Sequence, residues 1–448
     1  MPATPPAHRP VQPLDVVPLN LFQQLARQWD AAHPYNAAQA VRVARAAPGA
    51  VAAGDTWGAA LAALGLGRAV HTPVGNYGFE VLNGQLRSYP VRVAPPGAAV
   101  DDVLSAMVNE PFADAGEPPF RAVVVPVMDG THWLGVVYQH WAADSVSVRR
   151  LLGEWFVRLH DPAAAERTRR AARLARADYW RRYGPRSGGW GAGHVLTFAR
   201  RYFRYRTVRK VDGTGLDDPR VRYARRDAAD GTPARLRAYA RGQGVKVHDV
   251  LQAALIEACA AHVPMQRRRP WRRDVAAGAI LDLRPHRPAV TDAAFGALLG
   301  FGAVACRPDD VRDWPRLLRS VARQNAVHKR GGVPQASLAW LLAARAAARF
   351  VPPPRLAHFY RKELPLAGGL SNVDLSRSWA AAYAPAVVLD YARVSPTGPI
   401  APVAVAATTF AGRLGLGITH RAATIDAGRA DALLRTMLGR IELLVASR

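Results

Sequence analysis

The chain is poor in cysteine, with only Cys259 and Cys306 among its 448 residues. Two cysteines this far apart in sequence exclude a disulfide framework and a cysteine-based zinc site, and they suit a reducing compartment. The first residues show no apolar run behind basic ones, so no secretory signal peptide is predicted. We therefore expect a cytoplasmic protein.

Long apolar runs and nucleotide-binding loops are also missing. The most apolar stretch, residues 336–350, is interrupted by Arg345 and Arg349 and is shorter than the roughly 20 apolar residues that a membrane helix needs. No G-x-x-x-x-G-K-[ST] motif occurs, so ATP chemistry is not predicted. The histidines show no paired ligands at metal spacing, and we expect no metal site.

Lysine is scarce as well, although the net charge is +26: only 4 of the 60 basic residues are lysines and 56 are arginines. The arginines are scattered, with denser runs at residues 200–210 and 266–273. We interpret these runs as solvated surface; the alternative is attraction of a phosphorylated ligand, an acidic protein or, by peripheral contact, an anionic membrane. No DNA- or RNA-binding signature accompanies the charge, so specific nucleic-acid binding is not expected.

The length and the apolar fraction of 50% suit two domains or two halves of one large core. A glycine-rich break begins near residue 184, and we place a linker at 185–215 between an N-terminal half, 1–184, and a C-terminal half, 216–448. Strand and helix patterns interleave in both halves, which predicts an α/β fold of α+β layers.

Residues 120–139 predict a β-hairpin, because two β-rich runs flank Asp129-Gly130, a strong turn signal. The apolar period then changes from 2 to 3.6 over residues 148–159, which predicts a helix with Ser145 or Ser147 as its N-cap. His140 lies between strand and helix. In the second half we expect helices on both sides of Gly242 and Gly244, a strand at 274–285, helices near 314–328 and 336–350, a loop at 366–376, and two further strand regions before a final helix.

His140 and Asp144 form an H-x-x-x-D spacing within QHWAADS. The spacing alone has little specificity, but its position on a strand-to-helix turn makes it a candidate site. A neutral imidazole, with a reference pKa of about 6.5, can remove a proton from a hydroxyl or amine as it attacks. His140 and Asp144 are therefore the first candidate residues for a functional site.

QHWAADS resembles the HHxxxDG motif of the condensation-domain and chloramphenicol-acetyltransferase-like superfamily, which also includes wax-ester synthases, mycobacterial polyketide acyltransferases and plant BAHD enzymes. Four later segments resemble segments of this superfamily in the same order: GVKVHDVLQAALIEACA, ILDLRPHRP, FGALLGFGAVACRPDD and GGLSNVDLS. The resemblance implies two chloramphenicol-acetyltransferase-like halves that form a V-shaped pseudo-dimer around a central cleft or tunnel.

The resemblance also implies an activity, namely acyl transfer from a CoA or acyl-carrier-protein thioester to a hydroxyl or amine of a small molecule or lipid. His140 would act as the general base, without a covalent acyl-enzyme and without a permanently bound cofactor. Asp144 would support the catalytic loop by pairing with Arg284, or as second choice with Arg287; an ordinary surface ion pair is the alternative. Each thioester donor is a co-substrate and so a partner of the chain.

Four other residues are candidates for oxyanion or substrate contacts. Ser371 or Asn372 in GGLSNVDLS offers a hydrogen-bond donor, although the same residues also suit an ordinary turn. Gln139 and Ser145 stand where the motif has its first histidine and its glycine. These departures keep two alternatives open: a free-standing condensation domain that joins carrier-bound substrates by an amide or ester, and a non-catalytic carrier-protein docking module.

Overall fold

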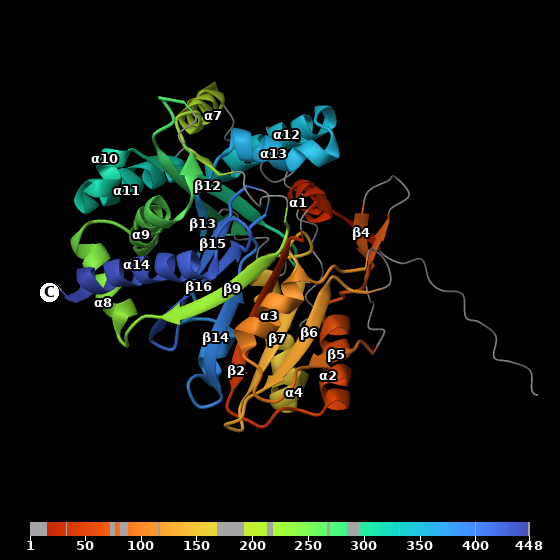
Figure 1. Cartoon of the computed structure of the whole chain (residues 1–448). Coiled ribbons are helices and arrows are strands. Elements are labelled where there is room, and N and C mark those ends of the chain that lie inside the picture. Colours follow the sequence, from red (N-terminus) through yellow and green to blue (C-terminus); the bar gives the residue numbers. More distant parts are fainter. Residues whose placement is uncertain are drawn as a thin grey trace, which may run out of the picture.

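The computed structural model describes residues 16–32, 34–71, 77–80, 88–113, 117–167, 192–212, 218–266, 269–284, 295–330, 332–398 and 400–446. Within them the chain forms two layered α/β halves that face each other, each built on one main sheet (Figure 1). The mixed fold of α+β layers, with its two halves arranged as a pseudo-dimer, is the fold predicted from the sequence.

The N-terminal half is built on a five-stranded sheet in the order β14-β2-β7-β6-β5. Its strands are β2 (Asn36–Val43), β5 (Val91–Val93), β6 (Phe120–Pro126), β7 (His132–Gln139) and β14 (Val388–Val394). Strands β6 and β7 pair antiparallel from Phe120 opposite Tyr138 to Pro126 opposite His132, so the predicted hairpin is confirmed. Helices α2 (Ala50–Ala63) and α4 (Ser145–His160) pack on one face of this sheet, and α3 (Val100–Asn109) packs on the other.

The C-terminal half is built on a six-stranded sheet in the order β12-β11-β13-β15-β16-β9. Its strands are β9 (Val221–Asp227), β11 (Val275–Asp282), β12 (Leu299–Cys306), β13 (Gly368–Asp374), β15 (Val403–Phe410) and β16 (Arg413–Arg421). The apolar faces of α8 (Thr232–Gly242), α9 (Val247–His262), α11 (Trp314–Arg330) and α14 (Ala427–Ala446) cover it. Both cysteines are free and buried, Cys259 within this core and Cys306 at the end of β12.

Smaller elements complete the fold. A three-stranded sheet joins β1 (Val16–Pro18), β4 (Tyr77–Glu80) and β3 (Ala69–His71), and β8 (Lys210–Val211) pairs with β10 (Met265–Gln266). The remaining helices are α1 (Leu21–Ala32), α5 (Pro162–Arg167), α7 (Ala192–Tyr205), α10 (Pro308–Arg312), α12 (Val333–Phe350), α13 (Pro353–Glu363) and a 3-10 helix (Trp379–Tyr383). No helix within the described ranges is long and apolar enough to cross a membrane.

Strand β14 ties the two halves together, because it follows β13 in the chain but pairs antiparallel with β2 in the N-terminal sheet (Figure 1). The buried Tyr391 hydroxyl on β14 donates to Gln39 Oε1 on β2 at 2.7 Å. The division at 1–184, 185–215 and 216–448 therefore remains a prediction about the chain. Of the expected linker, residues 185–191 lie outside the described part of the chain, and residues 192–205 form α7.

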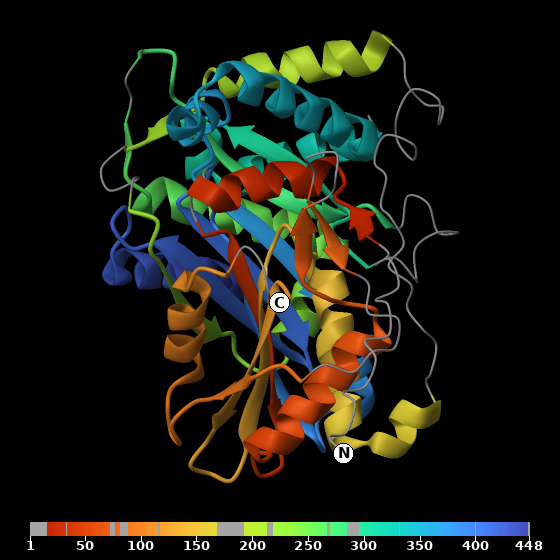
Figure 2. The same ribbon diagram turned by 90° about the vertical axis from the view of Figure 1, so that its right-hand side faces the viewer.

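Helices α1, α12 and α13 lie together where the halves meet. Figure 2 shows α1 between these helices and the N-terminal sheet. α1 packs against both of them, and Trp29 on α1 makes an edge-on ring contact with Tyr360 on α13, with ring centroids 5.7 Å apart. This layer covers the space between the two main sheets.

Two local predictions were wrong. Residues 366–376 were expected to form a loop, but β13 runs there between the parallel neighbours β11 and β15. Gly368 packs closely in this strand, since an added Cβ would lie 3.0 Å from Cys259 Sγ. The N-cap of α4 is Asp144, whose side chain accepts from the Ser147 amide, and not Ser145 or Ser147.

Candidate active site

His140 lies where β7 ends and the turn into α4 begins. Its backbone amide donates to the Tyr35 carbonyl at 2.9 Å, and its ring stacks on the Tyr35 ring with centroids 5.3 Å apart. The ring also lies 5.9 Å from that of Tyr138. The imidazole is therefore fixed by an aromatic wall on the N-terminal half.

The environment of His140 keeps its imidazole neutral. Burial lowers the pKa of His140 below its ordinary value of 6.5, while its own backbone carbonyl and the Asp144 carboxylate partly oppose this shift. Nδ1 is enclosed and forms no hydrogen bond to another residue of the described chain. At neutral pH the ring therefore has the protonation state that a general base needs.

Asp144 and Arg284 form a fully buried, two-pronged ion pair between the halves. Arg284 Nη1 donates to Asp144 Oδ2 at 2.7 Å, and Nη2 donates to Oδ1 at 3.2 Å. Backbone amides of Ser147 and Leu298 also donate to this carboxylate, each at 2.9 Å. Burial raises the pKa of Asp144, but Arg284 and the amides outweigh it and hold the pKa below its usual value.

Ser147 and Gly296 complete this clamp. Arg284 Nη2 donates to Ser147 Oγ at 3.0 Å, and Ser147 Oγ donates to the Gly296 carbonyl at 2.9 Å. The Gly296 carbonyl also accepts from the Asp144 amide at 3.2 Å. Gly296 has a φ of 134°, a conformation that side-chain-bearing residues rarely adopt. The clamp thus fixes the turn that carries His140 to the segment before β12.

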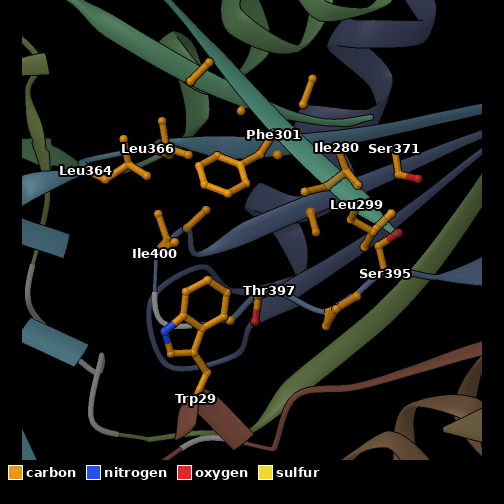
Figure 3. Close-up of a pocket in the computed structure, with 18 of the residues that line it drawn as sticks. Trp29, Ile280, Leu299, Phe301, Leu364, Leu366, Ser371, Ser395, Thr397 and Ile400 are labelled. Atoms are coloured by element: carbon orange, nitrogen blue, oxygen red, sulfur yellow. The ribbon is translucent and has the colours of Figure 1, made fainter. Parts of the chain in front are cut away.

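A cavity of about 550 Å³ opens beside His140 between the two sheets. Its wall is mostly apolar, and Figure 3 shows Trp29, Ile280, Leu299, Phe301, Leu366 and Ile400 around it. Glycines at 278, 302 and 369 contribute bare backbone to the wall, which leaves room for a ligand. Such a space accepts an apolar group next to the imidazole.

The other predicted site residues separate into two groups. Ser145 and Ser371 line the cavity, and Figure 3 shows Ser371 at its edge. Gln139 and Asn372 are not among the lining residues. The Gln139 amide instead donates to Asp30 Oδ2 at 2.8 Å, so it braces α1 against the end of β7. Arg287, the second choice as partner of Asp144, lies outside the described residues.

The sequence did not indicate several residues of this site. Tyr35, Gln39, His328 and Arg393 line the cavity, and Arg393 reaches it from the crossing strand β14. None of them stands in a recognisable motif, and only the fold brings them together. In the part of the chain that the structure describes, no group of three or more His, Cys, Asp and Glu side chains is arranged to hold a metal ion.

Several proteins of solved structure share this architecture. No protein-family model matches the sequence, and no curated protein matches it. Among solved structures, the first condensation domain of the CDA synthetase matches with a TM-score of 0.68 and 12% identity over 96% of each chain. The condensation domain of the Monacolin K polyketide synthase MokA matches at 0.66 and 11%, covering 97% of this chain and 98% of that one.

A third match concerns condensation domain-mediated chain release from the enacyloxin polyketide synthase. It has a TM-score of 0.56 and 15% identity, and it covers 99% of this chain and 84% of that chain. These likenesses extend along nearly the whole chain, and His140, Asp144 and Arg284 meet at the interface of its two halves. The chain therefore has the two-halved fold of condensation domains.

Proposed function

We propose that the protein is a condensation-type acyltransferase that moves an acyl group from a carrier-bound phosphopantetheine thioester to an amine or hydroxyl acceptor. The observation that supports this most is the neutral, buried His140 beside an apolar cavity, on a turn fixed by the Asp144–Arg284 clamp. In this proposal Asp144 and Arg284 are positioning residues, and His140 is the catalytic residue.

The proposed chemistry needs one base and no covalent intermediate. His140 takes the acceptor proton as the acceptor oxygen or nitrogen bonds to the thioester carbonyl carbon. The tetrahedral intermediate then collapses, the carbon–sulfur bond breaks, and the leaving thiolate takes up the proton. Because Nδ1 is enclosed, we assign the base to Nε2. Burial raises the pKa of both thiols, Cys259 and Cys306, to about 12, so neither is suited to act as nucleophile.

The developing oxyanion needs a donor at the cavity wall, and Ser371 and Ser145 both lie there. Arg393 Nη2 donates to Ser371 Oγ at 2.6 Å, so the Ser371 hydroxyl proton is left to point elsewhere. The Gln39 side-chain amide Nε2 donates a hydrogen bond to the backbone carbonyl of Ser145 at 2.8 Å. We favour Ser371 as the donor, because its oxygen is already engaged as an acceptor by a cation.

The donor we favour is a carrier protein, because proteins with this fold act within synthetases and a polyketide synthase. Acyl-CoA carries the same phosphopantetheine arm and is the second donor to be tested. A non-catalytic docking module is supported less well, since docking alone needs neither a fixed neutral imidazole nor a cavity beside it. A cytoplasmic location and peripheral contact with an anionic membrane stay predictions.

The test is acyl transfer from carrier-bound and CoA-bound thioesters to a panel of amines and alcohols, followed by thiol release and product mass. His140→Ala should lower turnover by about 10² to 10⁴, the usual contribution of general-base catalysis. His160→Gln is the matched control, because His160 lies at the far end of α4 and does not line the cavity. If His140→Ala is as active as the wild type, the proposed role of His140 is wrong.

A further inference from the structure

Arg393 is a buried cation at the cavity wall. It lies on β14, is 4% exposed, and belongs to the residues that line the cavity beside His140. Its strong hydrogen bond goes to Ser371 Oγ at 2.6 Å; weaker ones reach the Ala407 carbonyl at 3.4 Å and Thr408 Oγ1 at 3.5 Å. These partners are all neutral.

No carboxylate within the described residues pairs with Arg393. Two other arginines with little exposure differ in this respect, because Arg284 pairs with Asp144 at 2.7 Å and Arg225 pairs with Asp390 at 2.7 Å. A buried charge that lacks a counter-charge is costly, and folded proteins normally neutralise it. An anionic ligand would therefore supply the counter-charge that Arg393 lacks among the described residues.

Arg149 is a second cation near Arg393, although it does not line the cavity itself. It lies on α4 one turn after Ser145, and its Nη1 atom is buried without a hydrogen-bond partner in the described chain. Burial, together with the nearby charge of Arg149, lowers the pKa of Arg393 to about 10. Arg393 stays charged at neutral pH, and neither guanidinium group has an acidic partner among the described residues.

The rest of the cavity wall is mostly apolar. Figure 3 shows Phe301, Leu364, Leu366 and Ile400 at one side and Ser371 at another. A ligand that fills this space needs an apolar body, and an anionic group at its Arg393 end would supply the missing charge. Hydrogen bonds between ionised groups are about twice as strong as neutral ones, so this end would fix the orientation of the ligand.

We infer that Arg393, with support from Arg149, binds the carboxylate of a substrate whose apolar body fills the cavity. This inference rests on the proposed function for the statement that the ligand is a substrate. It assigns the substrate class, an apolar molecule that carries a carboxylate, and it makes Arg393 a determinant of specificity.

The test is a binding measurement that does not need turnover. Octanoate and octanamide are probes of nearly the same shape that differ in charge, and calorimetry at neutral pH gives their affinities for the full chain. The wild type should bind octanoate at least about tenfold more tightly than octanamide, which corresponds to about 1.4 kcal/mol. Arg393→Met should bring the two affinities within about twofold, and Arg393→Lys should keep part of the preference.

Two further variants separate the site from general effects of charge and stability. Arg149→Met should reduce the preference for octanoate only in part. Arg158→Met, on the same helix α4 but paired with Glu154 at 2.7 Å, removes one positive charge away from the cavity and should leave the preference unchanged. Melting temperatures of all variants, with and without octanoate, show whether each remains folded and whether the ligand still stabilises it.

The outcomes are distinct. Equal affinities of the wild type for octanoate and octanamide would overturn the inference. An equal loss of affinity for both ligands in Arg393→Met would overturn it as well. Inorganic phosphate that binds in an Arg393-dependent manner, without any preference for octanoate, would show a phosphate site instead and overturn the carboxylate assignment. Absence of acyl transfer with the octanoate preference intact would count against the proposed function alone; transfer without the preference would count against the inference alone.

Discussion

His140 is buried against Tyr35, and this burial lowers its pKa below 6.5. The proposed base is active when neutral, so we expect activity to be lost only as the pH falls through this lowered pKa. We predict that kcat/KM is flat near pH 7 and declines in acid with an apparent pKa below 6.5. A pH profile with a slow acyl donor, so that chemistry limits the rate, measures it.

The same profile for Tyr35→Leu is the control. This variant removes the stacked ring and opens the site to water, so the acid limb should move toward the ordinary histidine value. An apparent pKa above 6.5 in the wild type would show that another group controls the acid limb.

Asp144 and Arg284 are expected to act as one unit. Removing one partner of a buried pair costs about 3 to 5 kcal/mol. In Asp144→Asn the buried Arg284 keeps only the partly exposed Asp282 as a carboxylate partner, so both the melting temperature and activity should fall. Arg284→Met in the same chain should add little, because contacting residues are not additive. Thermal unfolding of the single and double variants measures this.

The partly exposed ion pair of Glu154 and Arg158 on α4 gives the comparison. A double-mutant cycle on Glu154 and Arg158 should give a coupling free energy of at most about 1 kcal/mol, as ion pairs in contact with solvent usually do. Additive losses for Asp144 and Arg284 would mean that the two residues act separately.

Sequence reasoning at this scale found residues within motifs and missed those without one. His140, Asp144 and Arg284 were proposed because QHWAADS and ILDLRPHRP resemble known segments, and the structure pairs Asp144 with Arg284. Gly296 and Arg393 were missed, since a positive φ and a cavity-facing position on a crossing strand leave no periodic signal. Gln139 and Asn372 were candidates by position in a motif, but neither lines the cavity.

Among the elements, β14 carries the coupling between the halves. Tyr391 is 3% exposed and packs in the N-terminal core, and its hydroxyl donates a hydrogen bond to Gln39 on β2. Tyr391→Ala should cost about 3 to 5 kcal/mol, as removal of a large buried aromatic side chain does. Hydrogen exchange should then show loss of protection in β2 and β14 of the N-terminal sheet and also in β15 of the C-terminal sheet, which contacts β14.

Tyr391→Phe is the matched variant, because it keeps the ring and removes only the hydroxyl. It should cost about 1 to 3 kcal/mol by leaving the Gln39 oxygen without its partner. If Tyr391→Ala affects exchange only within the N-terminal sheet, β14 is merely an edge strand of that sheet and does not couple the halves.

The elements themselves were predictable where their pattern is local. The 120–139 hairpin has alternating residues and an Asp-Gly turn, and α11 has a regular apolar stripe. Strand β13 was not recognised because its glycines and polar residues suggest a loop, and its partners β11 and β15 are distant in sequence. The crossing of β14 into the other sheet is a long-range contact that a single sequence does not encode locally.

For the whole molecule, 60 basic residues stand against 34 acidic ones, so the net charge of +26 cannot be balanced by acidic side chains of the chain itself. Both candidate donors are anionic, since CoA carries phosphates and carrier proteins typically have acidic surfaces. Positive surface charge raises the rate of encounter with such partners. The attraction is screened beyond a Debye length of about 8 Å at physiological salt.

We therefore predict that kcat/KM for a carrier-bound donor falls several-fold between low and high salt, while kcat at saturating donor changes little. The reason is that encounter takes place at the charged surface, whereas the proposed chemistry takes place at His140, which is 8% exposed. Steady-state kinetics at several salt concentrations measure both quantities. A neutral pantetheine thioester is the control, because it presents the same thioester without phosphates or an acidic protein surface, and its response to salt should be much flatter. If charged and neutral donors respond identically, the arginine excess has no role in donor capture and reflects composition alone.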